Sequence, residues 1–288
     1  MGGSRCGPEA LHSLNPATEK DFEFHVPRHQ PIGHLTMALQ GLAMKPLRGV
    51  GGFYAMTLDT LVAIPRRPFP WREFWLQCWF IARVSVLPAL LLAVPFTVLT
   101  AFTLNVLLVD FGAADAAGTG AGIAMAQLGP IVTVLVVAGA GATAICADLG
   151  ARTIREELDA LRVMGINPIQ TLVVPRVLAA SIVAVLLSAV VSLATLMGSF
   201  FFSVFVQGVT PGYYVAGLTV LTGYIDVLIL LLKAGLFGLA AGLIGCYKGI
   251  SVGGGPAGVG NAVNETVVYS FLALYVINLL VTAGQFGI

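Results

Sequence analysis

From residue 84 onward, long stretches without a charged residue alternate with short segments that carry charge. A helix needs roughly 20 apolar residues to cross the hydrocarbon core of a bilayer, and most of these stretches have room for one helix. The stretch between Arg176 and Asp226 is too long for a single helix, and turn-forming residues cluster in it at 207–212. The pattern therefore predicts five membrane-spanning helices, at about 84–109, 118–147, 173–206, 223–248 and 263–286.

Composition excludes several other classes of protein. Charged residues make up 10% of the chain and hydrophobic residues 57%, with a mean hydropathy of +0.91. A soluble globule or a disordered chain needs far more polar surface than this. The net charge of +1, without a dense basic block, argues against nucleic-acid binding. Four cysteines without paired spacing indicate neither a disulfide framework nor a metal site. We therefore expect an all-α integral membrane protein.

The distribution of Lys and Arg predicts how the spans are oriented. Basic residues cluster before the first span and between the second and third, and Lys248 ends the fourth, whereas the connections at 110–117 and 207–222 contain none. Loops rich in Lys and Arg stay on the cytoplasmic side. The N-terminus is therefore expected in the cytoplasm and the C-terminus in the periplasm.

Three tryptophans precede the first predicted span. Trp71, Trp75 and Trp79 recur at every fourth residue and so share one helical face. Because tryptophan prefers the headgroup level, the spacing predicts an interfacial helix at 66–83 that turns into the membrane. The alternative is that these tryptophans extend the first span. Residues 1–65 are expected to form a cytoplasmic tail and an amphipathic region, ahead of a membrane domain at 84–288.

A short amphipathic helix is predicted at 153–164, in the connection between the second and third spans. Thr153 and Glu156 fit a capping box, and Gly165 suits the left-handed position that closes a helix. At about 1.5 Å per residue, such a helix is too short to cross a bilayer. It could serve as a rigid lever for a soluble partner, or it could lie passively on the membrane surface.

Five motifs carry a resemblance to a known family: 127–132 (QLGPIV), 138–142 (AGAGA), 164–168 (MGINP), 172–176 (LVVPR) and 264–270 (NETVVYS). In them the chain resembles the MlaE/YrbE permeases, the membrane part of ABC systems that transport lipids and work with MCE proteins. The resemblance covers roughly residues 75–288. The long tail and the segment 79–84 resemble the actinobacterial branch, in particular its B-type subunit.

The resemblance implies a role for several segments. The helix at 153–164 would be the coupling helix that docks into the ATPase, with contacts at Arg155, Glu156, Glu157, Asp159, Leu161, Met164 and Gly165. A central lipid cavity would be lined by Leu104, Leu108, Gln127 and Leu128. This chain departs from the bacterial MlaE pattern at two positions, because Gln127 replaces a carboxylate and Ala140 replaces an arginine. A cargo other than a phospholipid becomes plausible for this reason.

The resemblance also implies partners and a location. A second permease, giving a heterodimer, two copies of a cytoplasmic ATPase and an external MCE hexamer would complete the complex in a bacterial inner membrane. No G-x-x-x-x-G-K-[ST] occurs in the sequence, so ATP and magnesium would be bound by the partner ATPase and this chain would not be an enzyme. The alternative function is a non-transporting membrane scaffold or a membrane-embedded enzyme.

Two further features of the predicted fourth span have more than one interpretation. Asp226 and Lys233 are ionisable groups in or beside an apolar helix, where such groups often have a function. They could also lie at the external interface, with the lysine extending toward it. Gly238 and Gly242 form a pair of small residues that favours close helix packing, with a hinge as the alternative.

Overall fold

A computed structural model describes residues 49–66, 69–112, 120, 131–221 and 223–285. The chain divides into two compact units, Met1–Gly49 and Val50–Ile288, and the elements below belong to the second. Within the described residues, the regular elements are all helices. Five of them are long and apolar enough to cross a membrane: Trp71–Phe96, Ile131–Ile154, Ile169–Phe205, Tyr224–Ile250 and Gly255–Gln285. The all-α membrane fold with five spans is therefore confirmed.

The first long helix, α2 (Trp71–Asp110), is continuous over 40 residues. Residues 71–83 of the predicted interfacial helix and the predicted first span are parts of this one helix, and there is no turn at residue 83. At 1.5 Å per residue, α2 is about 60 Å long, roughly twice the hydrocarbon thickness of a bilayer. No glycine interrupts α2, and it accommodates Pro88 and Pro95, as membrane helices can where neighbouring groups satisfy the freed backbone. The three tryptophans are all exposed on it.

The second span changes its helical geometry at the predicted glycine motif. Residues 131–136 are α-helical, a π-helical segment η2 (Val137–Ala142) follows, and α4 (Thr143–Ile154) completes the span. The small residues of η2 allow close contact with the fourth span, since a Cβ on Gly245 would lie 2.7 Å from the carbonyl oxygen of Ala142. Sequence periodicity did not predict this segment.

The third and fourth spans are connected by a helix that the sequence did not predict. A π-helical turn η3 (Ile169–Val173) leads into α6 (Val174–Phe205), and α8 (Tyr224–Ile250) forms the fourth span. Between them, the turn predicted at 207–212 is present at residues 207–210, and α7 (Pro211–Leu221) follows it in the rest of the connection. The turn residues end at Pro211, which suits the first position of a helix. The buried Tyr214 anchors α7 to α6, because its hydroxyl lies 2.6 Å from Ser199 Oγ.

The last span, α9 (Gly255–Gln285), begins eight residues before the predicted start. The glycine-rich segment at 253–258 is partly helical, and Gly254 and Gly255 in it have positive φ. Asn264 lies inside the helix. An ion pair between Lys248 Nζ and Glu265 Oε2, 2.5 Å apart, joins α8 to α9 beside the connection.

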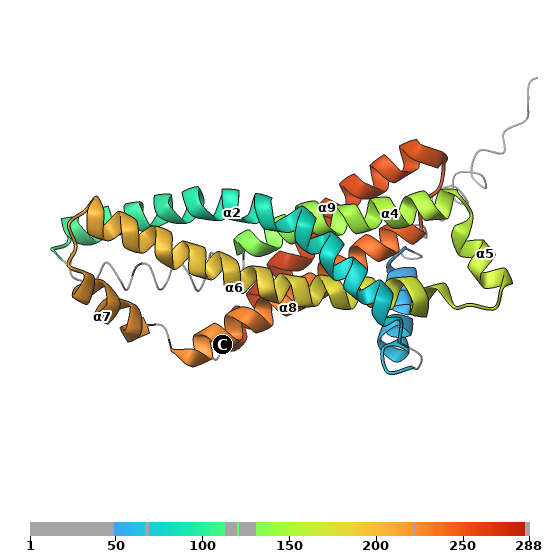
Figure 1. Ribbon diagram of the computed structural model, residues 1–288, viewed down its shortest axis with the longest axis horizontal. Coiled ribbons are helices and arrows are strands. Elements are labelled where there is room, and N and C mark those ends of the chain that lie inside the picture. Colours follow the sequence, from blue (N-terminus) through green and yellow to red (C-terminus); the bar gives the residue numbers. More distant parts are fainter. Residues whose placement is uncertain (1–48, 67–68, 113–119, 121–130, 222, 286–288) are drawn as a thin grey trace, which may run out of the picture. The chain divides into compact units, whose positions relative to one another are not determined.

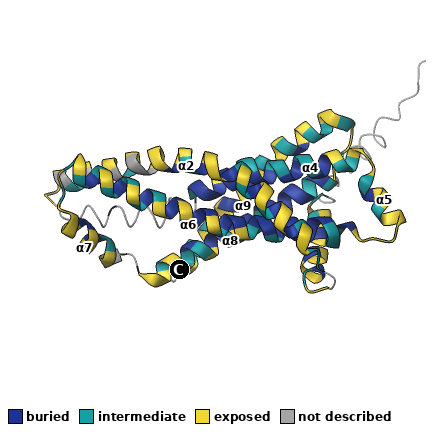
Figure 2. Cartoon of the chain, in the orientation of Figure 1, coloured by how far each residue is buried: buried dark blue, intermediate teal, exposed yellow. Residues whose placement is uncertain are grey.

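The packing of the helices places α5 (Glu157–Val163) and α7 at opposite ends of the bundle (Figure 1). Helix α6 contacts both α2 and α8, and α8 also contacts α4 and α9. Gly238 and Gly242 face Ala184 and Ala180 of α6, which supports the packing interpretation of this pair. Buried residues gather where these helices meet, while large apolar side chains remain exposed along α2 and α6 (Figure 2). Such a surface suits contact with lipid.

Candidate functional site

The connection between α4 and α5 turns sharply at Glu156. Its φ of 59° is in the left-handed region, which is uncommon for a residue with a side chain. Helix α5 therefore starts at Glu157, and the predicted capping box is wrong. Thr153 instead lies in the last turn of α4, where its hydroxyl donates to the carbonyl oxygens of Leu149 and Gly249. The coupling helix predicted at 153–164 is thus split between the end of α4 and the seven residues of α5.

The end of α5 agrees with the prediction made for Gly165. This residue has a φ of 76°, and its N–H donates to the carbonyl of Arg162. The N–H of Ile166 donates to the carbonyl of Leu161. The two bonds form a Schellman motif, which satisfies carbonyl groups left open at a helix end. These hydrogen bonds therefore fix the direction of the backbone where it leaves α5.

The two sides of α5 have different surroundings. Leu158 is buried and Leu161 is half-buried, and both pack into the apolar cluster that includes Ile145, Leu149 and Leu172. On the other side, Val163 is 90% exposed and Met164 at the C-cap is 64% exposed. Beside them lies a pocket of about 380 Å³, lined by Arg162 and residues 165–169. An exposed apolar tip beside a pocket, bordered by charge, is suited to binding another protein.

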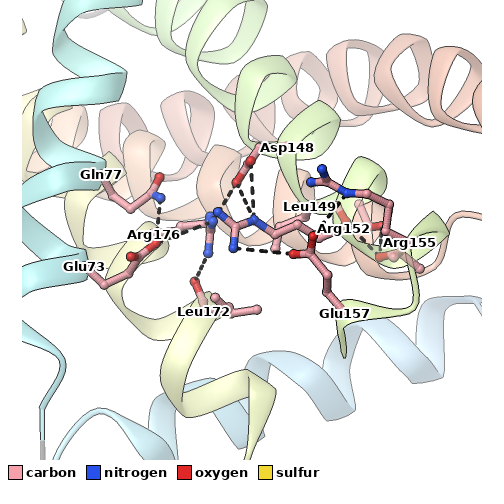
Figure 3. Close-up of polar contacts among 11 residues, drawn as sticks. Glu73, Gln77, Asp148, Leu149, Arg152, Arg155, Glu157, Leu172 and Arg176 are labelled. Atoms are coloured by element: carbon pink, nitrogen blue, oxygen red, sulfur yellow. Dashed lines mark hydrogen bonds and ion pairs between the residues drawn. The ribbon is translucent and has the colours of Figure 1, made fainter. Parts of the chain in front are cut away.

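Ion pairs connect the first turn of α5 to the membrane helices (Figure 3). The carboxylate of Glu157 lies 3.1 Å from Arg155 Nε and 3.8 Å from Arg152 Nη1. Arg152 Nε in turn lies 3.3 Å from an oxygen of Asp148, one turn earlier in α4. Asp159 pairs instead with Arg162 at 2.8 Å on the exposed side. Glu157 is therefore engaged within the chain, whereas Asp159 is accessible from outside.

Arg176 extends this network into the bundle. Its side chain is 0% exposed, and its Nη2 lies 2.6 Å from Asp148 Oδ2 and 3.6 Å from Glu73 Oε1. Its Nη1 donates to the carbonyl of Leu172 at 2.9 Å, and Gln77 donates to Glu73 at 2.9 Å. We call Glu73, Asp148, Arg152, Glu157 and Arg176 the ionic chain. It links α5 to α4, α6 and α2, because a buried guanidinium needs partners of this kind.

Sequence reasoning missed the ionic chain as a unit. The sequence did mark two of its members. Asp148 ends the charge-free stretch of the second span, and Arg176 precedes the charge-free stretch of the third. Charges at such positions usually reach the headgroup region. The pairing of Arg176 with Asp148 across 28 residues depends on the tertiary arrangement that brings the start of α6 to α4, which no local spacing encodes.

The other predicted site residues lie elsewhere. Asp226 Oδ2 accepts the N–H of Gly223 at 2.9 Å, and Oδ1 accepts from Gln285 at 3.2 Å. Lys233 is 2% exposed, and its Nζ donates to Thr282 Oγ1 at 3.0 Å. Both residues thus tie α8 to α9 through different partners. In the predicted cavity, Leu104 and Leu108 are half-buried on α2, while Gln127 and Leu128 lie outside the described residues. The cavity stays a prediction.

Comparison with known proteins decides the family. Residues 74–283 match the family described as permease MlaE. This chain belongs to the MlaE permease family. A probable ABC transporter permease of Synechocystis is 32% identical over 152 residues, 53% of this chain and 58% of that protein. A probable ABC transporter permease of Rickettsia felis is 34% identical over 156 residues, 54% and 60% of the two chains.

A plant protein is also similar to this MlaE-family chain. The chloroplast protein TRIGALACTOSYLDIACYLGLYCEROL 1 of Arabidopsis thaliana is 28% identical over 160 residues, 56% of this chain and 46% of the plant protein. The chain thus spans about half to three fifths of the length of these curated relatives.

Proposed function

We propose that this chain is the membrane-embedded permease subunit of an ABC transporter, driven by a separate ATPase that docks on α5. The observation that carries the proposal is the two-sided nature of α5. Its exposed tip at Val163 and Met164 offers an apolar contact, while its first turn is joined to three membrane helices by the ionic chain. A short helix built in this way transmits a movement of its partner to the spans and does not absorb it.

Membership of the MlaE permease family and two relatives named as probable ABC transporter permeases support the same function. In the proposed complex, two ATPase copies bind ATP and magnesium, and two permeases, this chain and a second related one, enclose the cargo between them. The N-terminus and α5 face the cytoplasm of a bacterial inner membrane, and α7 faces an MCE hexamer in the periplasm. The arrangement of Lys and Arg along the chain supports this orientation.

We propose that the cargo is a lipid or a similarly apolar molecule. The name of the Arabidopsis relative contains that of a galactolipid. The five spans also leave large apolar side chains exposed, and the described residues in them include few charges. Extraction and mass spectrometry of molecules retained by the purified complex test this assignment. Recovery of only water-soluble compounds would contradict it.

The ATPase assignment is tested by co-purification with a tag on this chain. Val163→Asp places a carboxylate on the exposed tip of α5, where it breaks no contact within the chain. Loss of a central apolar contact typically costs an interface about 2 kcal/mol, which is about a thirtyfold loss of affinity. The control is Val50→Asp, the same change at an exposed valine outside the candidate spans. We expect the first variant to lose the ATPase and the second to retain it. Equal retention of the ATPase by both variants would exclude α5 as the docking element. Absence of any ATPase from the unmodified preparation would instead support a scaffold.

A further inference from the structure

An apolar pocket lies at the start of α2, on a different part of the molecule from α5. It has a volume of about 360 Å³, and its lining includes Ile64, Arg66, Phe69, Trp71, Phe74 and Ile182. Three of these rings form one cluster: the centroid of Phe69 lies 4.9 Å from that of Trp71 and 5.9 Å from that of Phe74. The volume is in the range of small-molecule sites, about 300–1,000 Å³.

The pocket has one apolar side and one cationic side. Phe74 is buried at its base, whereas Trp71 and Ile182 are 64% and 46% exposed at its edge. Ile182 belongs to the candidate span Ile169–Phe205, so this edge opens toward the hydrocarbon of a membrane. At the other edge, Arg66 is exposed and has no ion pair with another described residue.

We infer that this pocket binds one anionic phospholipid of the surrounding bilayer, separately from any transported cargo. The apolar lining takes the upper part of an acyl chain, and the guanidinium of Arg66 binds the phosphate. Trp71 marks the boundary between these two parts, since tryptophan rings prefer the depth at which headgroups meet acyl chains. The arginine is suited to this role because its planar fork matches the geometry of phosphate oxygens.

Charge and position favour a lipid over a protein as the occupant. A second copy of this chain would cover Trp71 and Ile182 only if it also placed a carboxylate beside Arg66. A phospholipid of the bilayer supplies both an anionic group for Arg66 and an apolar group for the lining. Its phosphate lies beside its acyl chains, as the arginine lies beside the apolar residues of the pocket. The inference needs only that the helices span a membrane, and it does not depend on an ATPase or on transport.

The test uses the three tryptophans of the chain as reporters. The double variant Trp75→Phe/Trp79→Phe leaves Trp71 alone, and Trp71→Phe/Trp75→Phe leaves Trp79, which is 71% exposed and does not line the pocket. Each full-length variant is reconstituted in phosphatidylcholine vesicles with the same series of increasing mole fractions of brominated phosphatidylglycerol or brominated phosphatidylcholine. Bromine quenches tryptophan fluorescence only at contact. We expect the anionic lipid to quench Trp71 at a lower mole fraction, and Trp79 to show no headgroup preference.

Adding Arg66→Gln to the Trp71 variant should reduce its preference for the anionic lipid about fivefold, the effect expected for one basic residue near an anionic surface. Arg66→Lys should retain most of the preference. Glycerol phosphate in solution should not relieve the quenching. Three results would overturn the inference: equal quenching of Trp71 by both lipids, protection of Trp71 from both lipids by a protein occupant, or relief by glycerol phosphate, which would indicate a site for a free anion.

Discussion

Replacing Arg176 with Met tests whether the ionic chain holds the bundle together at the α5 end. Methionine keeps a long apolar side chain but removes the guanidinium from Asp148, Glu73 and the Leu172 carbonyl. Removing one partner of a buried ion pair typically costs about 3–5 kcal/mol. Here the two carboxylates are 33% and 27% exposed, and Asp148 keeps Arg152 at 3.3 Å, so water and this arginine reduce the penalty. We expect Arg176→Met to lower the free energy of unfolding by about 2–3 kcal/mol.

The assay is unfolding of the purified protein in mixed micelles by increasing mole fractions of dodecyl sulfate, followed by tryptophan fluorescence. A double-mutant cycle with Asp148→Asn isolates the shorter contact, and a cycle with Glu73→Gln isolates the longer one. The coupling energy should be larger for Asp148 at 2.6 Å than for Glu73 at 3.6 Å.

Arg162→Met is the matched control for Arg176→Met. Arg162 also pairs with a carboxylate at 2.8 Å, but both side chains are more than half exposed, and such pairs contribute about 0–1 kcal/mol. An unchanged stability of Arg176→Met, or equal effects of the two substitutions, would show that burial does not strengthen this network and would refute the reasoning.

Two further predictions concern the packing of α6. Gly238→Ala should destabilise the protein by about 1–3 kcal/mol, because the added Cβ would lie 2.5 Å from Ala184 Cβ and 2.6 Å from the Ala180 carbonyl oxygen; Gly260→Ala, where nothing lies within 4 Å, should not, and a comparison of their unfolding curves decides this. Tyr214 lies outside the candidate spans, and burial raises the pKa of its phenol while its hydrogen bond with Ser199 lowers it to a smaller extent. Because the folded state then holds the proton more tightly than the unfolded state, the stability from this group is present below the unfolded pKa of about 10 and declines as the pH rises above it. Tyr214→Phe should cost about 1 kcal/mol at neutral pH and should remove this alkaline decline; an identical pH profile for both proteins would contradict the assignment.

The sequence predicted the spans well because a membrane helix is a local property. Charge-free stretches of sufficient length identify such helices whatever their neighbours are. The same reasoning predicted the end of α5, since a left-handed residue such as Gly165 is encoded by the residue itself. It was wrong about the start of α5. Thr153 has the right spacing from Glu156, but its hydroxyl bonds across to Gly249 of another helix.

The sequence alone determined that the protein lies in a membrane, how many spans it has and which family its motifs resemble. It also determined that a short helix closed by Gly165 lies between two spans. Only the tertiary structure determined that α2 continues through both its predicted parts, that α7 is a helix, and that Arg176 joins residues from α2 and α4. The physical reason is the range of the interactions. Hydropathy and turn preference depend on residues within one helix or one turn, whereas a buried arginine is stabilised by carboxylates that come from distant parts of the chain.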